Sequence, residues 1–246
     1  MNDPGRKIRS WRSVCRQDKH PSGYGTPAEM LGRGPRSAPP GTPLVCAPSK
    51  MRVFCAIDLP DNVRERSRRH IARLRDALPQ TQASWSRDQI HLTLKFLGEI
   101  ANSRVESLSQ AAFRSVEGLS PFAVFVEETG AFPKHGPPRV LWIGVTDPST
   151  KLTALHARLE EECAKAGFAK EQRPFHPHLT LARLRKAQGA RTLASVHKEL
   201  GFEPVEVTVS ELLVMRSELG NEGSKHTVIS RHPLPSAAAV SPRISL

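Results

Sequence analysis

The tetrad His-Leu-Thr-Leu occurs twice in this chain, at residues 91–94 and again at residues 178–181, 87 positions further on. Both copies lie in segments whose apolar pattern predicts a β-strand, and the order of predicted elements around the two copies is similar. A duplicated lobe explains both observations. The repeat therefore favours a fold built from two related halves.

Strand geometry determines where the side chains of each tetrad point. Successive side chains alternate between the two faces of a strand, so the leucines of a tetrad share one face and its histidine and threonine share the other. The leucine face suits a core. If the two halves pair about a pseudo-twofold axis, four polar side chains converge in one cleft: His91, Thr93, His178 and Thr180.

The predicted elements from residue 52 onward are mixed. Strands are expected at 52–58, 82–86, 89–97, 121–127, 139–145, 177–183, 205–215 and 226–231, and helices at 61–78, 102–116, 149–166 and 189–200. Residues 130–138 contain two Gly and three Pro and are expected to form a loop. The runs of strand-helix-strand-strand favour the α+β class, with two pseudo-symmetric lobes around a central cleft. Each lobe is expected to be an antiparallel sheet with flanking helices.

The first 50 residues differ from the rest in composition. They contain 14 Gly and Pro, and 9 Lys and Arg against 3 Asp and Glu, which indicates disorder. We expect residues 1–50 to be a disordered or spurious extension, with the functional protein starting at Met51. Residues 51–234 are the expected domain, and residues 235–246 a flexible tail.

The charge, the apolar runs and the cysteines limit which partners and which cell compartment can be expected. The formal charge of +12 favours an anionic partner such as nucleic acid. No apolar stretch approaches the roughly 18 to 20 residues that a membrane helix needs, so no membrane is expected. The four cysteines show no C-x-x-C spacing, which favours reduced thiols in a cytoplasmic protein.

Paired histidines and threonines suit the opening of a five-membered cyclic phosphate. One imidazole can deprotonate water and the other can protonate the departing ribose oxygen, because imidazole titrates near the working pH. The threonine hydroxyls can donate hydrogen bonds to the non-bridging oxygens, where charge builds in the transition state. This chemistry needs no metal, no cofactor and no covalent intermediate.

The tetrads and their flanks resemble the two-histidine (2H) phosphoesterases, and more closely the RNA 2′,3′-cyclic phosphodiesterases, also called 2′-5′ RNA ligase-like proteins. The matching stretches are 51–60, 90–99, 138–142 and 173–183, and the resemblance extends from Met51 to about Leu234. It implies two α+β lobes around a cleft lined by the tetrads. It also implies hydrolysis of a terminal 2′,3′-cyclic phosphate on RNA to a 2′-phosphate. Some members also join RNA ends through a 2′-5′ bond.

The resemblance also implies roles for individual residues. His91 and His178 match the two catalytic histidines, while Thr93 and Thr180 match the phosphate-binding threonines. Arg183 matches a basic residue near the phosphate, where a guanidinium fork suits phosphate oxygens. The identical tetrads leave open which histidine is the acid; by analogy His91 is the acid and His178 the base.

Four aromatic residues are candidate stacking platforms for a terminal base, because RNA recognition often stacks unpaired bases on aromatic rings. Phe132 in the predicted Gly/Pro loop is the expected base contact. The other three are more simply explained by core packing: Phe96, Trp142 and Phe175. The chain departs from the family pattern at Cys55 and His176.

Three other functions remain open. The same cleft suits 2′-5′ RNA ligation or a small cyclic-nucleotide phosphodiesterase, and the basic surface suits a non-catalytic RNA-binding module. A metal at His176 and His178 is disfavoured, because zinc sites use three or four ligands. The arginine-rich run 64–69 is expected on a solvated helix face. The expected protein is a monomer, and six histidines are expected in solvent or in loops: His70, His135, His156, His197, His226 and His232.

Overall fold

The computed structural model describes residues 49–86, 90–220 and 223–235. Contacts between Cα atoms divide the chain into two units, Met1–Val45 and Cys46–Leu246, and every described residue belongs to the second unit. The expected N-terminal extension, except for residues 49 and 50, and the C-terminal tail beyond residue 235 lie outside the described residues.

The described elements follow the mixed order of strands and helices that the sequence predicts. The strands are β1 (Lys50–Ile57), β2 (Ala83–Trp85), β3 (Leu92–Ala101), β4 (Phe122–Phe132), β5 (Val140–Thr146), β6 (His178–Leu184), β7 (Val205–Val209), β8 (Glu211–Gly220) and β9 (Gly223–Pro233). The helices are α1 (Asp61–Ala77), the short 3-10 helix η1 (Asn102–Arg104), α2 (Val105–Val116), α3 (Lys151–Lys165) and α4 (Ala190–Leu200). None of the helices in the described part of the chain is long and apolar enough to span a membrane.

Within the described residues, the nine strands form one sheet in the order β7-β4-β5-β6-β3-β1-β8-β9, with β2 paired to β6. All strand pairs are antiparallel. The two sheets expected from the sequence are therefore halves of one sheet. A single residue pair, Leu92 with Leu179, joins β3 of one half to β6 of the other.

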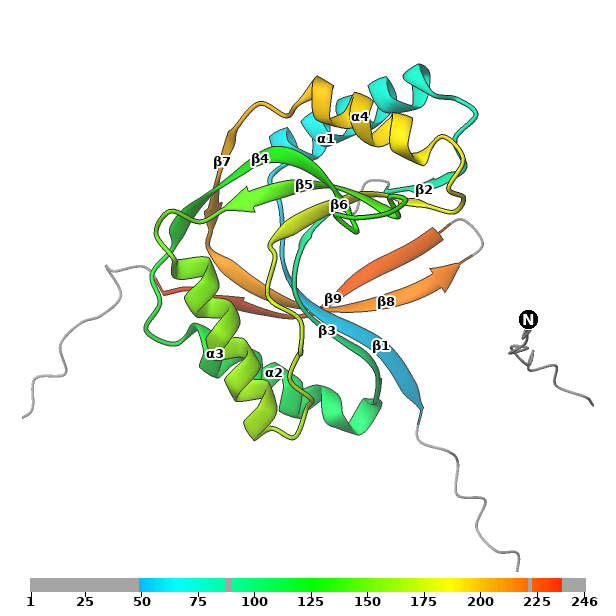
Figure 1. Ribbon diagram of the computed structural model, residues 1–246. Helices are drawn as coiled ribbons and strands as arrows, with labels where there is room; N and C mark the ends of the chain where they lie inside the picture. Colours follow the sequence, from blue (N-terminus) through cyan, green and yellow to red (C-terminus); the bar gives the residue numbers. More distant parts are fainter. Residues whose placement is uncertain (1–48, 87–89, 221–222, 236–246) are drawn as a thin grey trace, which may run out of the picture. The chain divides into compact units, whose positions relative to one another are not determined.

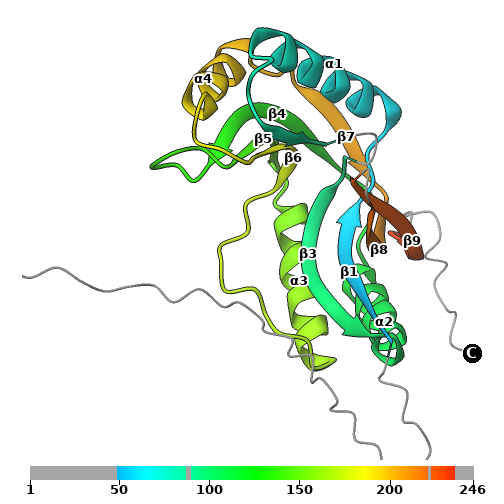
Figure 2. The same ribbon diagram turned by 90° about the vertical axis from the view of Figure 1, so that its right-hand side faces the viewer.

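The helices cover the two halves of the sheet in pairs. α1 and α4 pack over the half that contains β4, β5 and β6, while α2 and α3 pack against the half that contains β1, β3, β8 and β9 (Figures 1 and 2). Each half thus receives one helix from each half of the chain. We call the sheet surface opposite the helices the helix-free face.

The alternation in the tetrads produces the predicted burial. Leu92, Leu94, Leu179 and Leu181 are each at most 4% exposed and belong to the main core cluster. Removal of such side chains from water contributes roughly 25 cal/mol per Å² of apolar surface. The tetrad leucines therefore fix the strands on the helices, and the class of mixed helices with an antiparallel sheet is confirmed.

Two expected boundaries are wrong. The expected strand at 205–215 is two strands, because the alternation of buried Val205, Val207 and Val209 breaks at Ser210. β7 and β8 then pair in different halves of the sheet. The expected loop at 130–138 begins later, because β4 continues to Phe132.

Candidate active site

The two tetrads meet where the halves of the sheet join. Leu92 pairs with Leu179 in an antiparallel register. Extending this register by one residue in each direction sets the histidine of each tetrad opposite the threonine of the other. The four polar side chains lie on the helix-free face and are half-buried, since their leucine neighbours enter the core. The resulting pairs are His91 with Thr180 and His178 with Thr93.

An aromatic wall lies beside His178, formed by Phe132, Trp142 and His176. The ring centroids of Phe132 and His178 are 5.2 Å apart in a T-shaped arrangement, and those of Trp142 and His178 are 6.4 Å apart. Phe132 also contacts Trp142 and His176, each at 5.2 Å. These contacts restrict the orientation of the His178 ring.

The position of the Trp142 indole requires a glycine on the neighbouring strand. Gly130 of β4 pairs with Trp142 of β5, and a Cβ atom at Gly130 would lie 2.2 Å from Cζ2 of the indole. No side chain fits there while the indole keeps its place. Gly144, two pairs further along β5, lies opposite His178 itself.

The protonation state of His178 is determined by its surroundings. Its Nδ1 lies 2.7 Å from the carbonyl oxygen of His176, so Nδ1–H donates and Nε2 carries the lone pair. Burial lowers the pKa of His178, and the charges of His176 and Arg183 act in the same direction, partly opposed by the hydrogen bond to His176. The imidazole is therefore neutral at neutral pH, with a basic nitrogen available.

His91 has a comparable neighbourhood from other strands. The ring of Phe54, on β1, stacks on His91 with centroids 4.7 Å apart, and His226 of β9 meets His91 edge-on at 4.9 Å. Phe54 is only 3% exposed. The expectation that His226 lies in solvent or in a loop is wrong, because β8 pairs with β1 and carries β9 into the same half of the sheet.

Arg64 is a site residue that the sequence analysis missed. Its Nε donates to the carbonyl oxygen of Leu59 at 2.9 Å, its Nη1 donates to that of Ile90 at 3.1 Å, and it pairs with Asp58. Its side chain is only 18% exposed, so the expectation of a fully solvated arginine run is wrong at this position. Arg64 thereby fixes the backbone next to His91.

Arg183 and Phe132 both act on His178, Arg183 through its charge and Phe132 through ring contact. Arg183 is exposed on β6, and its charge acts on His178. Phe132 is half-buried at the end of β4, where its carbonyl oxygen accepts a hydrogen bond from Arg139 N at 2.6 Å. The expectation that Phe132 lies in a loop is therefore wrong, because this hydrogen bond extends the β4–β5 hairpin past Gly130.

Buried histidines support the aromatic wall from the opposite side of the sheet. His197 of α4 is fully buried, and its Nε2 lies 2.9 Å from the carbonyl oxygen of Trp142. His70 of α1 is 2.8 Å from the Nδ1 of His197, and burial lowers the pKa of His70 to about 4. His232 is also buried. The sequence placed these histidines in solvent or in loops. The partners of His70 and His197 come from distant parts of the chain, while His232 contacts Ser230 within β9.

Two other candidate stacking residues pack against neighbours. Trp142 is 8% exposed, and Phe175 stacks on His156 with centroids 3.9 Å apart. Both therefore lie in packed surroundings, as the simpler explanation expected.

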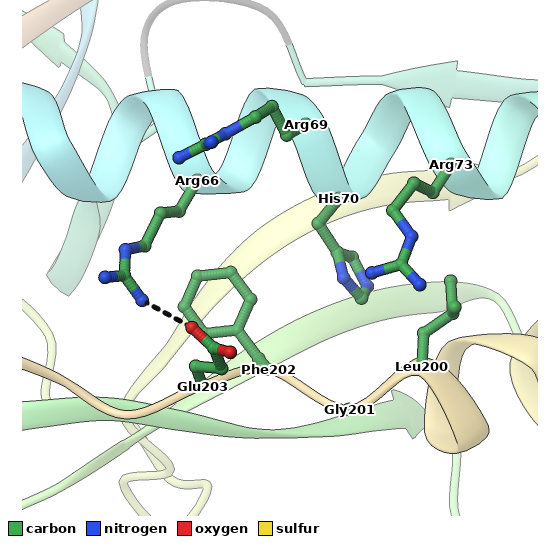
Figure 3. Close-up of a pocket in the computed structure, with 8 residues that line it drawn as sticks. All are labelled: Arg66, Arg69, His70, Arg73, Leu200, Gly201, Phe202 and Glu203. Atoms are coloured by element: carbon green, nitrogen blue, oxygen red, sulfur yellow. Dashed lines mark hydrogen bonds and ion pairs between the residues drawn. The ribbon is translucent and has the colours of Figure 1, made fainter.

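A cavity of about 420 Å³ lies between α1 and residues 200–203, on the helix-covered side of the sheet. Figure 3 shows the side chains of Arg66, His70 and Arg73 extending from α1 toward residues 200–203, and Arg66 pairs with Glu203 at 3.1 Å. This cavity is separate from the tetrads, which lie on the helix-free face. Within the described ranges, no three His, Cys, Asp or Glu side chains gather as metal ligands.

Several known proteins are similar to this chain in sequence. Residues 59–221 match the family model of the 2′-5′ RNA ligase superfamily. The chain is 32% identical over 182 residues to an RNA 2′,3′-cyclic phosphodiesterase of Methanothermobacter thermautotrophicus, covering 72% of this chain and 96% of that protein. It is 31% identical to the Escherichia coli protein of the same name, over 74% of this chain and 96% of the relative.

Solved structures with a similar fold point to the same family as the sequence relatives. The crystal structure of Escherichia coli LigT complexed with 3′-AMP superposes with a TM-score of 0.59 at 28% identity, over 76% of this chain and 99% of LigT. A crystal structure from Thermus thermophilus gives 0.61 at 26% identity, over 76% of this chain and all of the other. The match to the family model, the curated relatives and the shared fold show that this chain is a member of the 2′-5′ RNA ligase superfamily.

Proposed function

We propose that this protein hydrolyses the terminal 2′,3′-cyclic phosphate of RNA to a 2′-phosphate. The main support for this reaction is the pairing of Leu92 with Leu179, which sets two histidines and two threonines on one face of the sheet. The relatives named RNA 2′,3′-cyclic phosphodiesterase support the same reaction.

In this mechanism His178 is the general base and His91 the general acid. The Nε2 of neutral His178 accepts a proton from water as the water oxygen attacks phosphorus. The bond from phosphorus to the 3′ oxygen breaks, and His91 gives its proton to that oxygen. The lowered pKa of His178 and its Nδ1–H bond to a carbonyl oxygen support the base role. General acid–base steps contribute about 10²–10⁴-fold each.

The other site residues bind the phosphate. The hydroxyls of Thr93 and Thr180 donate to the non-bridging oxygens, and the guanidinium of Arg183 neutralises their charge. Phe132 holds the ring of His178 and borders the place of the terminal nucleoside. The reaction proceeds through these side chains without a metal or other cofactor.

Residues 51–234 form the catalytic domain, which acts as a monomer in the cytoplasm on RNA ends.

The test uses an oligonucleotide that ends in a 2′,3′-cyclic phosphate, with excess EDTA present. Conversion to a 2′-phosphate by the wild type is expected, with kcat at least about 10² lower in His91→Ala and in His178→Ala. Phe113→Ala changes an exposed residue of α2. It is the control and should keep the kcat of the wild type. Activity that needs added zinc or manganese would overturn the metal-free mechanism.

Other products would identify the other functions. Joined ends with a 2′-5′ bond would indicate ligation, and faster hydrolysis of cyclic mononucleotides would indicate a small-molecule phosphodiesterase. RNA binding that survives the double histidine substitution, with no turnover by the wild type, would indicate a binding module.

A further inference from the structure

Phe96 is an exposed aromatic residue on the same face as the tetrads. Its side chain is 51% exposed, although it lies within strand β3. The preceding residue, Lys95, points to the helix side, where its Nζ binds Glu160 of α3 at 2.7 Å. The register of β1 with β3 shifts at Leu94, so the simple alternation of the tetrad does not continue past this residue. Phe96 pairs with Phe54, which stacks on His91, so Phe96 points to the helix-free face. An exposed aromatic ring next to the candidate active site is available for stacking on an RNA base.

Arg52 of β1 covers part of this ring. Its Cζ lies 4.8 Å from the ring centroid of Phe96, within the range of a cation–π contact. Glu99 lies opposite Arg52 in the pairing of β1 with β3, but no ion pair joins Arg52 to an acidic side chain in the described structure. The donors of the Arg52 guanidinium can therefore bind a ligand.

Phe54 links the Arg52–Phe96 pair to His91 on the helix-free face. Phe54 stacks on His91 at 4.7 Å, and Phe54 pairs with Phe96 across β1 and β3. Cross-strand neighbours have Cβ atoms about 5 Å apart. The ring of Phe96 is therefore on the order of 10 Å from the imidazole of His91 along the helix-free face.

We infer that the Arg52–Phe96 pair is a subsite for the nucleotide that precedes the terminal one, which makes RNA chains better substrates than cyclic mononucleotides. This inference rests on the proposed function. A cyclic phosphate held between His91 and His178 is the 3′ end of its strand, so the chain can leave the site only on the 5′ side of the terminal nucleoside. A surface that extends from His91 can receive that part of the chain.

The chemistry of the pair matches one nucleotide of single-stranded RNA. An unstacked base packs on an aromatic ring or on the plane of a guanidinium, whatever its sequence. The guanidinium donors also suit the phosphate that links the two nucleotides. A cyclic mononucleotide has neither this base nor this phosphate, so it cannot use the subsite.

The experiment compares kcat/KM for a dinucleotide or trinucleotide ending in a 2′,3′-cyclic phosphate with kcat/KM for a 2′,3′-cyclic mononucleotide. In Phe96→Ser and in Arg52→Gln we expect a decrease on the order of tenfold for the oligonucleotides, within the range measured for one stacked base. Hydrolysis of the mononucleotide stays unchanged. Phe113→Ser, at an equally exposed phenylalanine of α2, is the matched control and changes neither substrate.

The outcomes separate this inference from the proposed function. Wild-type hydrolysis of both substrates with equal efficiency, or full oligonucleotide activity in both variants, overturns the subsite and leaves the hydrolase intact. An equal loss on both substrates also overturns it, because the substitutions then act through His91. A wild type inactive on both substrates overturns the proposed function and the subsite together.

Discussion

Leu92 of β3 and Leu179 of β6 form the one residue pair that joins the two halves of the sheet in the described structure. Both side chains are at most 1% exposed and lie in the main core cluster. The catalytic candidates His91 and His178 are their neighbours in sequence. The relative position of the two histidines therefore depends on how this leucine pair packs.

Leu179→Ala is expected to affect both stability and catalysis. Truncation of a buried leucine costs about 2–5 kcal/mol of unfolding free energy, and the loosened bridge lets the histidines move apart. Urea denaturation and kcat measure the two effects. The control is Leu193→Ala, since Leu193 of α4 is fully buried but belongs to a smaller core cluster separate from the main one. A similar fall in kcat in both variants would mean that the bridge has no special role.

Gly130→Ala is expected to lower kcat by displacing Trp142. The new Cβ would lie 2.2 Å from the indole, so the aromatic wall beside His178 must shift. Replacement of Trp142 by phenylalanine removes the clashing ring atoms. We therefore expect Trp142→Phe to restore part of the activity that Gly130→Ala loses, with a coupling energy of about 0.5–3 kcal/mol in the double-mutant cycle. Additive losses would contradict the contact.

Arg183→Gln is expected to shift the pH profile. The charge of Arg183 contributes to the lowered pKa of His178, so its removal raises that pKa. A base with a raised pKa stays protonated to higher pH. The acidic limb of the profile of kcat/KM therefore moves to higher pH, and KM rises because a phosphate contact is lost. Arg183→Lys keeps the charge, so its acidic limb stays in place. An unmoved limb in Arg183→Gln would show that Arg183 acts on binding alone.

Arg64→Met is expected to lower kcat more than it raises KM. The methionine fills similar space but loses the hydrogen bonds to the carbonyl oxygens of Leu59 and Ile90, which hold the segment before His91. A decrease in kcat on the order of tenfold corresponds to about 1.4 kcal/mol of lost positioning. Arg66→Met is the control, because Arg66 pairs with the exposed Glu203 at the cavity. Equal kcat values in the two variants would show that Arg64 does not position the segment before His91.

His70→Gln is expected to make the protein less sensitive to acid. Burial holds the pKa of His70 at about 4, below its ordinary value of 6.5. The neutral ring thus contributes stability that is complete above pH 6.5 and is lost as the pH falls towards 4. A glutamine amide can still donate to Nδ1 of His197 but does not titrate in this range. The buried His197 and His232, whose pKa values burial also lowers, leave a residual acid dependence.

The measurement for His70→Gln is the urea midpoint at pH values of about 7 and about 5, on either side of the ordinary histidine pKa. The wild type should lose more stability between the two than the variant does. His135→Gln, at an exposed histidine of the β4–β5 hairpin, is the control and should follow the wild type. An equal loss in all three proteins would show that His70 does not titrate with unfolding.

The sequence by itself determined the content of the site. Strand alternation is a local rule, so it assigned the tetrad leucines to the core and their histidines and threonines to the opposite face. The duplication of the tetrad predicted two related halves. The mixed order of strands and helices also predicted the class of the fold, because amphipathic periodicity is local.

Only the tertiary structure decided what surrounds the tetrads. Phe54 and His226 reach His91 through the pairing of β1 with β3 and β8 and of β8 with β9. The sequence also did not show that β7 and β8 are separate strands, since the apolar run of Leu212, Leu213 and Val214 masks the break at Ser210. Which strands pair across long sequence separations depends on the packing of the whole core, and periodicity in one segment carries no information about its partner. The same reason hid Arg64, whose acceptor at Ile90 is 26 residues away.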